Sequence, residues 1–419
     1  MSLPRFLPMQ RLLLPVLVVG LVLVSLLALV RTVMKTTAVD GGWDLHSYWY
    51  FGHFLRAGIN PYVAYAEGLA LPGPVHYLDG SVVAPDAVDQ PHLGHVPANT
   101  APILLLLSTL SFFPWTQAKQ IWLVCNLALI VAIPWFALRL LPPSLQLARP
   151  LAWLAAFSFY AMKGPRESAA TGQTSLLVFF LMIVTLLLRQ SHWLWAGIAL
   201  GVALGKYSLS LPVFLFLLWE KRFRLLGVAL LVQLLGLLAV TALGDHSLVD
   251  TLRVNWSMVA RHAVEVGVHV GYLLREYRIV ANVVVAAITL LTLGMVWHTR
   301  QRGWLAADLL PVNSALILWT VLAAYHRNYD ALMVILFLIL CLSAATTWQL
   351  PARQAQTLGL FWLVALGVMC LPGEIVRPFV TDAQADSFLV WVDRAMTLAL
   401  VAMLAVNLWL LPGTPRVDG

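Results

Sequence analysis

Charged side chains are scarce in this sequence, and their shortage excludes an ordinary soluble protein. They make up 11% of the 419 residues, whereas 61% are hydrophobic, and the mean hydropathy is +0.84. A soluble protein carries roughly a quarter charged residues. The net charge of +7 comes from basic residues spread over short segments between apolar runs. Because these residues form no continuous basic face, they indicate a membrane-topology signal, and we expect no nucleic acid partner.

Cysteine is scarce as well. The three cysteines, Cys125, Cys341 and Cys370, lie in or at the edge of apolar segments. None lies in the middle of a large polar segment, so the sequence predicts neither a disulfide framework nor a zinc site.

Long apolar runs, in contrast, dominate the chain. Segments such as 12–30 and 225–243 contain almost no polar side chain. Each has about the length that an α-helix needs to cross ~30 Å of hydrocarbon. The runs do not alternate apolar with polar residues, which excludes the strands of a membrane barrel. Arg5 and Arg11 precede the first run as in a signal peptide, but no small-residue cleavage site follows it. We therefore predict a retained first span.

These runs predict an all-α polytopic membrane protein that forms a single integral membrane domain over residues 1–419. A further apolar segment, 101–113, is short for a crossing and is predicted to be re-entrant or to lie at the surface. The twelve predicted spans are 12–30, 119–140, 150–161, 173–188, 193–204, 209–219, 225–243, 279–298, 309–325, 331–348, 357–371 and 393–411.

The distribution of charge predicts on which side of the membrane each segment between the spans lies. Basic residues concentrate in the segments predicted to lie inside, whereas most Asp and Glu lie in three large segments predicted to lie outside: 31–100, 244–278 and 372–392. The positive-inside rule therefore places both termini in the cytoplasm. Segment 244–278 also contains a candidate surface helix. Large outer segments favour recognition or chemistry at the outer face of the membrane.

The first outer segment is rich in polar and aromatic residues. Residues 44–57 are predicted to form an amphipathic helix at the membrane interface, with Asp44 at or near its N-cap. The aromatic run 48–51 fits an aromatic belt, and Gly58 to Tyr62 predict a helix stop followed by a tight turn. Asp44 then has two interpretations. A partly desolvated carboxylate can take a proton from a hydroxyl, or the residue only caps the helix.

Five short motifs occur in order along the chain, and together they resemble glycosyltransferase family 87. They are 44–48 (Asp-Leu-His-Ser-Tyr), 58–62 (Gly-Ile-Asn-Pro-Tyr), 172–173 (Gly-Gln), 206–212 (Lys to Pro) and 326–330 (His-Arg-Asn-Tyr-Asp). The family comprises membrane glycosyltransferases of the C-type (GT-C) fold that use polyprenyl-phosphate sugars, among them the mannosyltransferases of phosphatidylinositol mannoside synthesis. The resemblance extends over most of the chain, from the first span to the His326 motif. One departure is Pro-Ala-Asn-Thr-Ala-Pro at 97–102, where many relatives have Tyr-Pro-Pro.

The resemblance implies roles for the matched residues. Asp44 is implied as the general base for the acceptor hydroxyl, with Asp40 as its alternative. The resemblance implies that His326 hydrogen-bonds or protonates the donor phosphate. The alternative is that His326 has a purely structural role. The candidate substrate contacts are Asp40, His46, Tyr48, Asn60, Tyr62, Gln173 and Tyr329.

A polyprenyl-phosphate leaving group requires cations at the outer interface. The candidates are Lys163, Arg166, Lys206 and Arg327, because Arg grips phosphate oxygens in pairs and Lys acts as a point charge. The alternative for each is that its side chain only extends to the lipid headgroups.

A divalent metal has candidate ligands at Asp86, Asp89, His92 and His95, which recur at every third residue. Pro91 interrupts a continuous helix there, and the resemblance implies a monophosphate donor that needs no metal. We therefore predict no metal and no other cofactor.

The resemblance implies an inverting glycosyltransferase at the outer face of the cytoplasmic membrane, active in cell-envelope or lipid glycosylation. It would move mannose or arabinofuranose from a polyprenyl monophosphate to a glycolipid or glycan hydroxyl, among membrane lipids. Two alternatives stay open. One is a multi-span transporter or lipid flippase, which predicts ionisable residues within the spans and paired broken helices. The other is a polymerase or ligase that uses a pyrophosphate-linked donor.

Overall fold

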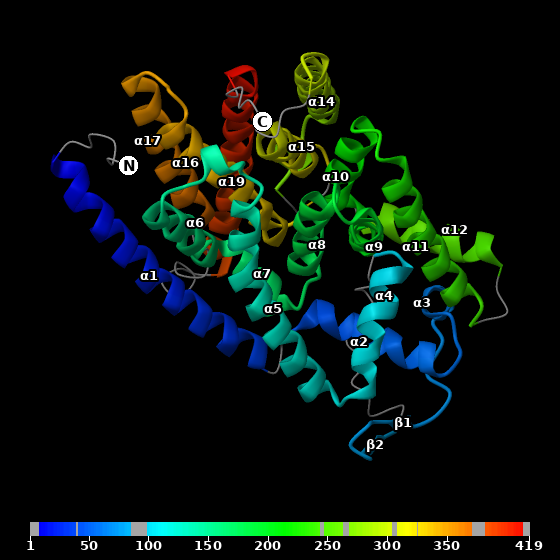
Figure 1. Cartoon of the computed structure of the whole chain (residues 1–419). Helices are drawn as coiled ribbons and strands as arrows, with labels where there is room; N and C mark the ends of the chain where they lie inside the picture. The colour runs from blue at the N-terminus through cyan, green and yellow to red at the C-terminus, as the bar shows by residue number, and fades with distance from the viewer. Residues whose placement is uncertain are drawn as a thin grey trace. The chain divides into compact units, whose positions relative to one another are not determined.

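A computed structural model describes residues 8–38, 41–84, 99–243, 247–262, 268–303, 308–324, 326–370 and 382–413. These residues are almost entirely helical, with one two-stranded hairpin (Figure 1), which confirms the all-α class. The chain forms two compact units, and each is described by itself. The loop unit comprises Val33–Leu129 and Ser168–Glu265, and the terminal unit comprises Met1–Thr32, Ile130–Glu167 and Val266–Gly419.

Within the described ranges, seven helical segments are long and apolar enough to cross a membrane: Pro15–Thr37, Trp115–Leu138, Trp193–Trp219, Phe223–Thr241, Arg278–Gln301, Asn328–Thr347 and Val390–Leu410. An eighth arises if α7 (Lys163–Thr171) and α8 (Ser175–Leu188), which are bent by 119°, form one broken span. A polytopic membrane architecture is therefore confirmed. The total of twelve spans and the side assigned to each loop stay predictions.

The segment Trp193–Trp219 reverses its direction along α8. It consists of α9 (Trp193–Ala203), the turn η3 (Leu204–Lys206) and α10 (Tyr207–Trp219). Arg189, just after α8, forms an ion pair with Glu220, just after α10, at 3.2 Å. Lys206, between α9 and α10, contacts Ser175 at the start of α8. The chain therefore runs along α8 and back, and the separate spans at 193–204 and 209–219 stay predictions.

The first part of the loop unit surrounds α2 (Trp43–Arg56), which follows α1 (Pro8–Thr37). Helix α2 packs against α3 (Pro61–Glu67), α4 (Ala101–Ser108) and the turn η1 (Thr109–Phe112). Between α3 and α4, strands β1 (Val75–His76) and β2 (Val82–Val83) pair antiparallel, with Val75 opposite Val83. Helices α5 (Trp115–Leu138), α11 (Phe223–Thr241) and α12 (Leu248–His262) follow. Helix α12 provides the helix that was predicted in segment 244–278.

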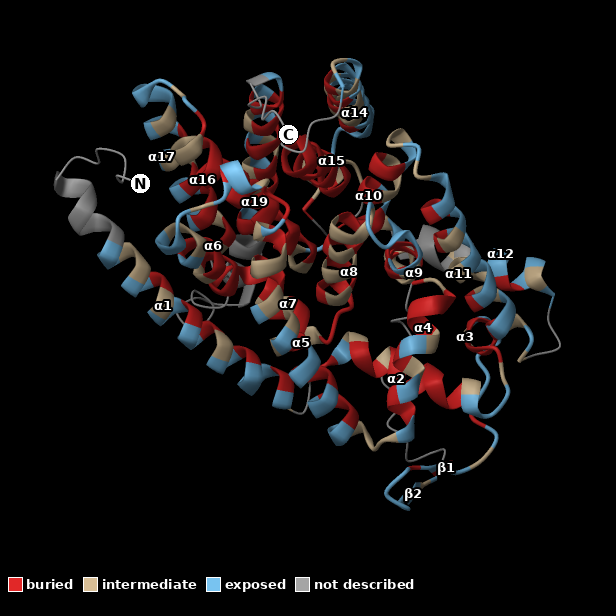
Figure 2. Ribbon diagram, in the orientation of Figure 1, coloured by how far each residue is buried: buried red, intermediate tan, exposed pale blue. Residues whose placement is uncertain are grey.

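The aromatic face of α2 is buried in protein, which corrects one prediction. The sequence predicts that Tyr48, Trp49, Tyr50 and Phe51 form an aromatic belt at the lipid headgroups, yet all four are at most 6% exposed. Figure 2 shows α2 largely in the colour of buried residues. The reason is that α4 and η1 cover this helix, a tertiary contact that the local pattern does not encode.

The short apolar segment 101–113 forms α4 and η1 rather than a long helix. The eight residues of α4 extend only about 12 Å. Its start is held inside the loop unit, because the Thr100 amide donates to the Gly205 carbonyl at 2.8 Å and Thr100 Oγ1 bonds to Gln233 Oε1 at 2.7 Å. This short, anchored helix agrees with the prediction that the segment is too short for a full crossing.

In the terminal unit, α15 (Leu309–Ala323) and α16 (Ile335–Thr347) are buried along almost their whole length. They pack against α14 (Arg278–Gln301), α17 (Ala352–Cys370) and α19 (Asp382–Leu410). The smaller elements are η2 (Pro143–Leu145), α6 (Arg149–Ala161), α13 (Val270–Leu273), η5 (Asn328–Val334) and η7 (Leu411–Gly413). Helix α14 exposes large apolar residues such as Ile279 and Leu290, as expected for a lipid-facing surface.

Candidate active site

The predicted site residues lie in both units. The loop unit holds Asp44, His46, Tyr48, Asn60, Tyr62, Gln173 and Lys206, and the terminal unit holds Lys163, Arg166, His326, Arg327 and Tyr329. Asp40 and the weighed metal ligands Asp86, Asp89, His92 and His95 lie outside the described residues. Elsewhere in the described chain, no group of three or more His, Cys, Asp or Glu side chains is placed to hold a metal ion.

Asp44 lies in the first turn of α2 and does not cap it, which corrects the capping interpretation. The N-cap is Gly42, in the left-handed region with φ 81°, and no described side chain caps the helix. The Gly42 amide donates to the Ala170 carbonyl at 3.0 Å, which fixes the start of α2 to the end of α7. A carboxylate in the first turn interacts favourably with the helix dipole. The Asp44 side chain is partly exposed and is therefore accessible for chemistry.

The Gly172-Gln173 motif lies directly against this first turn. Gly172 has φ 76°, and a Cβ atom on it would lie 2.6 Å from the Cβ of Leu45. The Trp122 indole N–H donates to the Gly172 carbonyl at 3.0 Å. Only glycine accommodates both the backbone conformation and this contact. Two motifs that are over 120 residues apart in the sequence are thus adjacent in the fold.

Lys206 and Gln173 form a second pair of predicted residues that the fold brings together. The Lys206 Nζ donates to Ser175 Oγ at 2.7 Å and to Gln173 Oε1 at 3.5 Å. Both contacts orient the Lys206 ammonium. The loop unit therefore places a lysine, an amide and the Asp44 turn around the junction of α7 and α8.

Asn99 connects this region, although no motif of the sequence marks it as a site residue. Its Nδ2 donates to the Tyr48 hydroxyl and to Thr174 Oγ1 at 3.2 Å. Its carbonyl accepts from the Tyr62 hydroxyl at 2.7 Å. Asn99 lies in 97–102, the segment that departs from the family pattern. A polar side chain just before an apolar helix was the sequence signal that could have identified it.

Tyr48 lies beside Asp44, one turn further along α2. Burial raises the pKa of the Tyr48 phenol well above its usual value, and the nearby Asp44 charge raises it further. The phenol therefore stays protonated and acts as a hydrogen-bonding group.

Asn60 caps helix α3. Its Oδ1 accepts a hydrogen bond from the Tyr62 amide at 3.1 Å, which fixes the position of Tyr62.

His46 lies among aromatic rings. Its ring contacts Trp49 and Trp115 edge-on, with centroids 5.0 and 4.6 Å away, and it is 8% exposed. These contacts show that His46 packs in the core of the loop unit. Its predicted substrate contact stays a prediction.

In the terminal unit, His326 and Asp330 form a buried pair. The His326 Nδ1–H donates to Asp330 Oδ2 at 3.2 Å, and the side chain of His326 is fully buried. Its Nε2 is buried without a hydrogen-bond partner among the described residues. A histidine that is oriented through Nδ1 by a carboxylate presents Nε2 as its reactive nitrogen. Arg327 is exposed and Tyr329 is partly exposed.

The first turn of α7 contributes the remaining cations. Lys163 forms an ion pair with Glu167 at 3.3 Å, and Arg166 Nε donates to the Met162 carbonyl at 3.1 Å. At Gly164, an added Cβ would lie 2.7 Å from the Leu332 amide nitrogen. The start of α7 therefore packs closely on η5, the turn that follows His326 and includes Asp330.

Comparison with known proteins gives one result. Residues 99–323 match the family model of glycosyltransferase family 87, which is more than half of the chain. The chain therefore belongs to glycosyltransferase family 87 and is a glycosyltransferase. The matched region includes Asn99, Gln173 and Lys206, whereas Asp44 and His326 lie outside it. No curated protein and no solved structure gives a significant match.

Proposed function

We propose that the protein transfers a sugar from a polyprenyl monophosphate to a hydroxyl group of a glycolipid or glycan, with Asp44 as the general base. Membership of the family supports the glycosyl transfer. The observation that carries the assignment of Asp44 is its position in the first turn of α2, beside Tyr48 and held against the Gly172-Gln173 segment.

The proposed reaction is a single displacement. The acceptor oxygen attacks the anomeric carbon while its proton passes to the Asp44 carboxylate. The bond between the anomeric carbon and the phosphate oxygen breaks, and polyprenyl phosphate leaves with that electron pair. One displacement inverts the configuration at the anomeric carbon. No covalent enzyme intermediate is required.

The cations and His326 are proposed to stabilise the leaving phosphate. Lys206 supports this role because its ammonium is oriented by Ser175 and Gln173 and attracts anionic oxygens. His326 supports it because Asp330 orients its ring, so that Nε2 can donate a hydrogen bond or a proton to phosphate. The leaving group is a monophosphate, and we propose that these residues bind it without a metal.

The sugar is proposed to be mannose or arabinofuranose, and the reaction is proposed to occur at the outer face of the cytoplasmic membrane. The direct experiment incubates the purified full-length protein in nanodiscs with radiolabelled polyprenyl-phosphate mannose or arabinofuranose and a membrane-lipid acceptor. We expect transfer from one of these donors by the wild-type protein. Transfer only from pyrophosphate-linked donors would contradict the proposal and favour a polymerase or ligase.

A further inference from the structure

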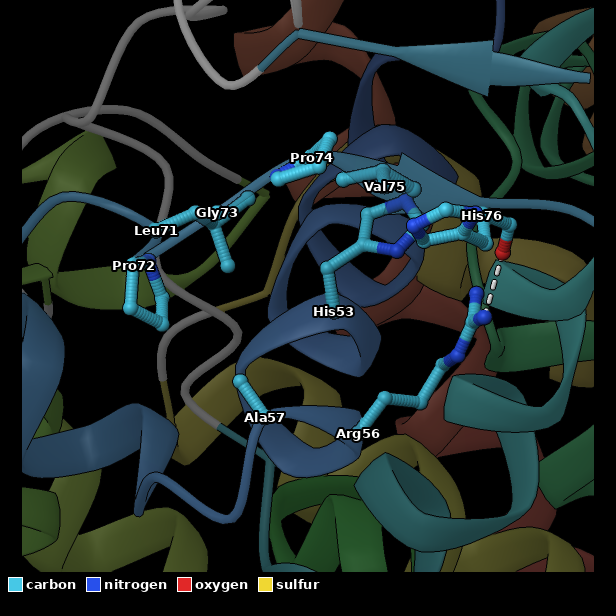
Figure 3. Close-up of a pocket in the computed structure, with 9 residues that line it drawn as sticks. All are labelled: His53, Arg56, Ala57, Leu71, Pro72, Gly73, Pro74, Val75 and His76. Atoms are coloured by element: carbon cyan, nitrogen blue, oxygen red, sulfur yellow. Dashed lines mark hydrogen bonds between the residues drawn. The ribbon is translucent and has the colours of Figure 1, made fainter.

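A pocket of about 310 Å³ lies in the loop unit, at the end of α2 opposite to Asp44. Its walls are His53, Arg56 and Ala57 of α2 and the chain from Leu71 to His76, which leads into β1 (Figure 3). His53 and Arg56 are three residues apart and extend from the same side of the helix. Twelve residues separate Asp44 from Arg56, or about 18 Å along the helix axis. The pocket is therefore distinct from the candidate active site.

Hydrogen bonds from Arg56 fix the walls of the pocket. Its Nη1 donates to the Ser111 carbonyl at 2.6 Å, and its Nη2 donates to the His76 carbonyl. The guanidinium lies over the Phe112 ring, 4.6 Å from the centroid. The Leu78 amide also donates to the Phe112 carbonyl at 2.7 Å. These contacts tie α2, η1 and the hairpin together, so the pocket is a formed feature of the unit.

No described residue of the pocket balances the charge of Arg56. Among the described residues that line it, none is Asp or Glu, and Arg56 forms no ion pair with the described part of the chain. A guanidinium has five N–H donors, and the two carbonyl contacts leave others available. A cation in a partly apolar wall without a carboxylate favours an anionic ligand.

His53 adds a neutral polar group to this wall. Its side chain is 3% exposed, and its Nε2 is buried without a hydrogen-bond partner among the described residues. Burial, together with the neighbouring Arg56 and His46, lowers the pKa of His53 to about 3. The imidazole is therefore neutral at pH 7. An unsatisfied buried nitrogen requires a partner, and a ligand in the pocket can supply one.

The size of the pocket limits the ligand. Small-molecule sites occupy roughly 300 to 1,000 Å³, so a pocket of about 310 Å³ fits one compact headgroup rather than an extended chain. Pro72, Pro74 and Val75 provide apolar wall on one side. The combination is a cation, a neutral hydrogen-bonding imidazole and an apolar face.

We propose that this pocket binds an organic phosphate, with its phosphate oxygens at Arg56 and its sugar or polyol moiety between His53 and the Leu71–His76 segment. The ligand is either the headgroup of a membrane phospholipid or a soluble sugar phosphate, since both present the same chemistry. The proposal does not depend on Asp44 acting as the base, because the two sites lie about 18 Å apart along α2.

The test measures binding to the full-length protein in phosphatidylcholine nanodiscs by titration calorimetry, with glucose 1-phosphate, glucose and glucuronate as probes. We expect glucose 1-phosphate to bind at least tenfold more tightly than the other two. Retention of phosphatidylinositol by the protein in native mass spectrometry, with little affinity for glucose 1-phosphate, identifies the lipid source instead. Equal affinity for all three soluble probes, without phosphatidylinositol retention, overturns the proposal.

Two variants connect binding to the pocket. Arg56→Gln removes the charge, and binding of the phosphate ligand should weaken at least tenfold. Because Arg56 also holds the hairpin, a second variant avoids its contacts: Gly73→Phe introduces a ring where an added Cβ meets open space, which should block the pocket. Val82→Phe, on exposed β2 and outside the pocket, is its matched control. Wild-type affinity in Gly73→Phe also overturns the proposal.

Discussion

Leu45 lies against Gly172 so closely that a Cβ on Gly172 would lie 2.6 Å from the Cβ of Leu45. This contact joins the turn that carries Asp44 to the junction that carries Gln173. The position of Asp44 therefore depends on Gly172, a residue that has no side chain.

Gly172→Ala should therefore destabilise the protein and reduce transfer. The positive φ alone costs on the order of 1–2 kcal/mol for alanine, and the contact with Leu45 adds to this cost. Thermal unfolding in detergent and the transfer rate measure the two effects. Gly227→Ala is the control, because a Cβ there meets no atom within 4 Å. If Gly172→Ala is as stable as the wild type, the contact between residue 172 and Leu45 adjusts without a loss of stability.

Asp44→Asn should abolish transfer and leave folding intact. The amide keeps the shape of the carboxylate but cannot accept the acceptor proton, and loss of a general base lowers rates by roughly 10² to 10⁴. The transfer assay gives the rate, and the unfolding temperature reports on folding. Asp79→Asn, a fully exposed carboxylate in the hairpin, should keep wild-type activity. An active Asp44→Asn variant would remove Asp44 from the proposed role.

Lys206→Met should raise the KM for the donor at least tenfold, because it removes a cation that Ser175 and Gln173 orient while it keeps the apolar stem. Initial rates over a range of donor concentrations measure this effect. The exposed Lys221 at the other end of α10 provides the control, and Lys221→Met should leave the KM unchanged. Wild-type values of both kcat and KM in Lys206→Met would argue against phosphate contact.

Tyr62→Phe should lower the unfolding free energy by about 1 kcal/mol, since it removes the hydrogen bond to the Asn99 carbonyl. Asn99→Ala removes the two side-chain donations and should cost more. Chemical unfolding followed by tryptophan fluorescence compares the variants. Tyr65→Phe on the same helix α3 is the control. If both tyrosine variants behave alike, Asn99 does not anchor this region.

The lowered pKa of His53 predicts that the stability of the protein depends on pH. Its folded pKa of about 3 lies below the ordinary value of about 6.5, so the unfolded chain binds the proton more readily between these two values. Stability is therefore fully present above about pH 6.5 and falls as the pH decreases toward 3, by on the order of 2 kcal/mol between pH 7 and pH 4.5. Unfolding temperatures at pH 7 and pH 4.5 measure this slope. His53→Gln should reduce the slope, whereas His76→Gln, at an exposed position, should not.

The class of the protein and its family were predictable from the sequence, because apolar runs and ordered motifs are local signals. The helix after the first span and the stop at Gly58, which has φ 73°, were predictable for the same reason. The burial of the α2 aromatic residues was not predictable, because α4 and η1 cover them from 45 or more residues away. Asn99 was missed for a related reason: its partners Tyr48, Tyr62 and Thr174 meet it only in the folded chain.

The return of the chain along α8 has a consequence for the surrounding bilayer. Helix α8 has 14 residues and α10 has 13, so each extends only about 20 Å, against ~30 Å of hydrocarbon in an unperturbed membrane. Helices this short draw the headgroups inward and thin the bilayer around them. Lys206 lies at one end of α8 and Arg189 at the other. If α8 crosses the bilayer as the sequence predicts, lipid phosphates beside Lys206 would lie deeper than in the bulk membrane.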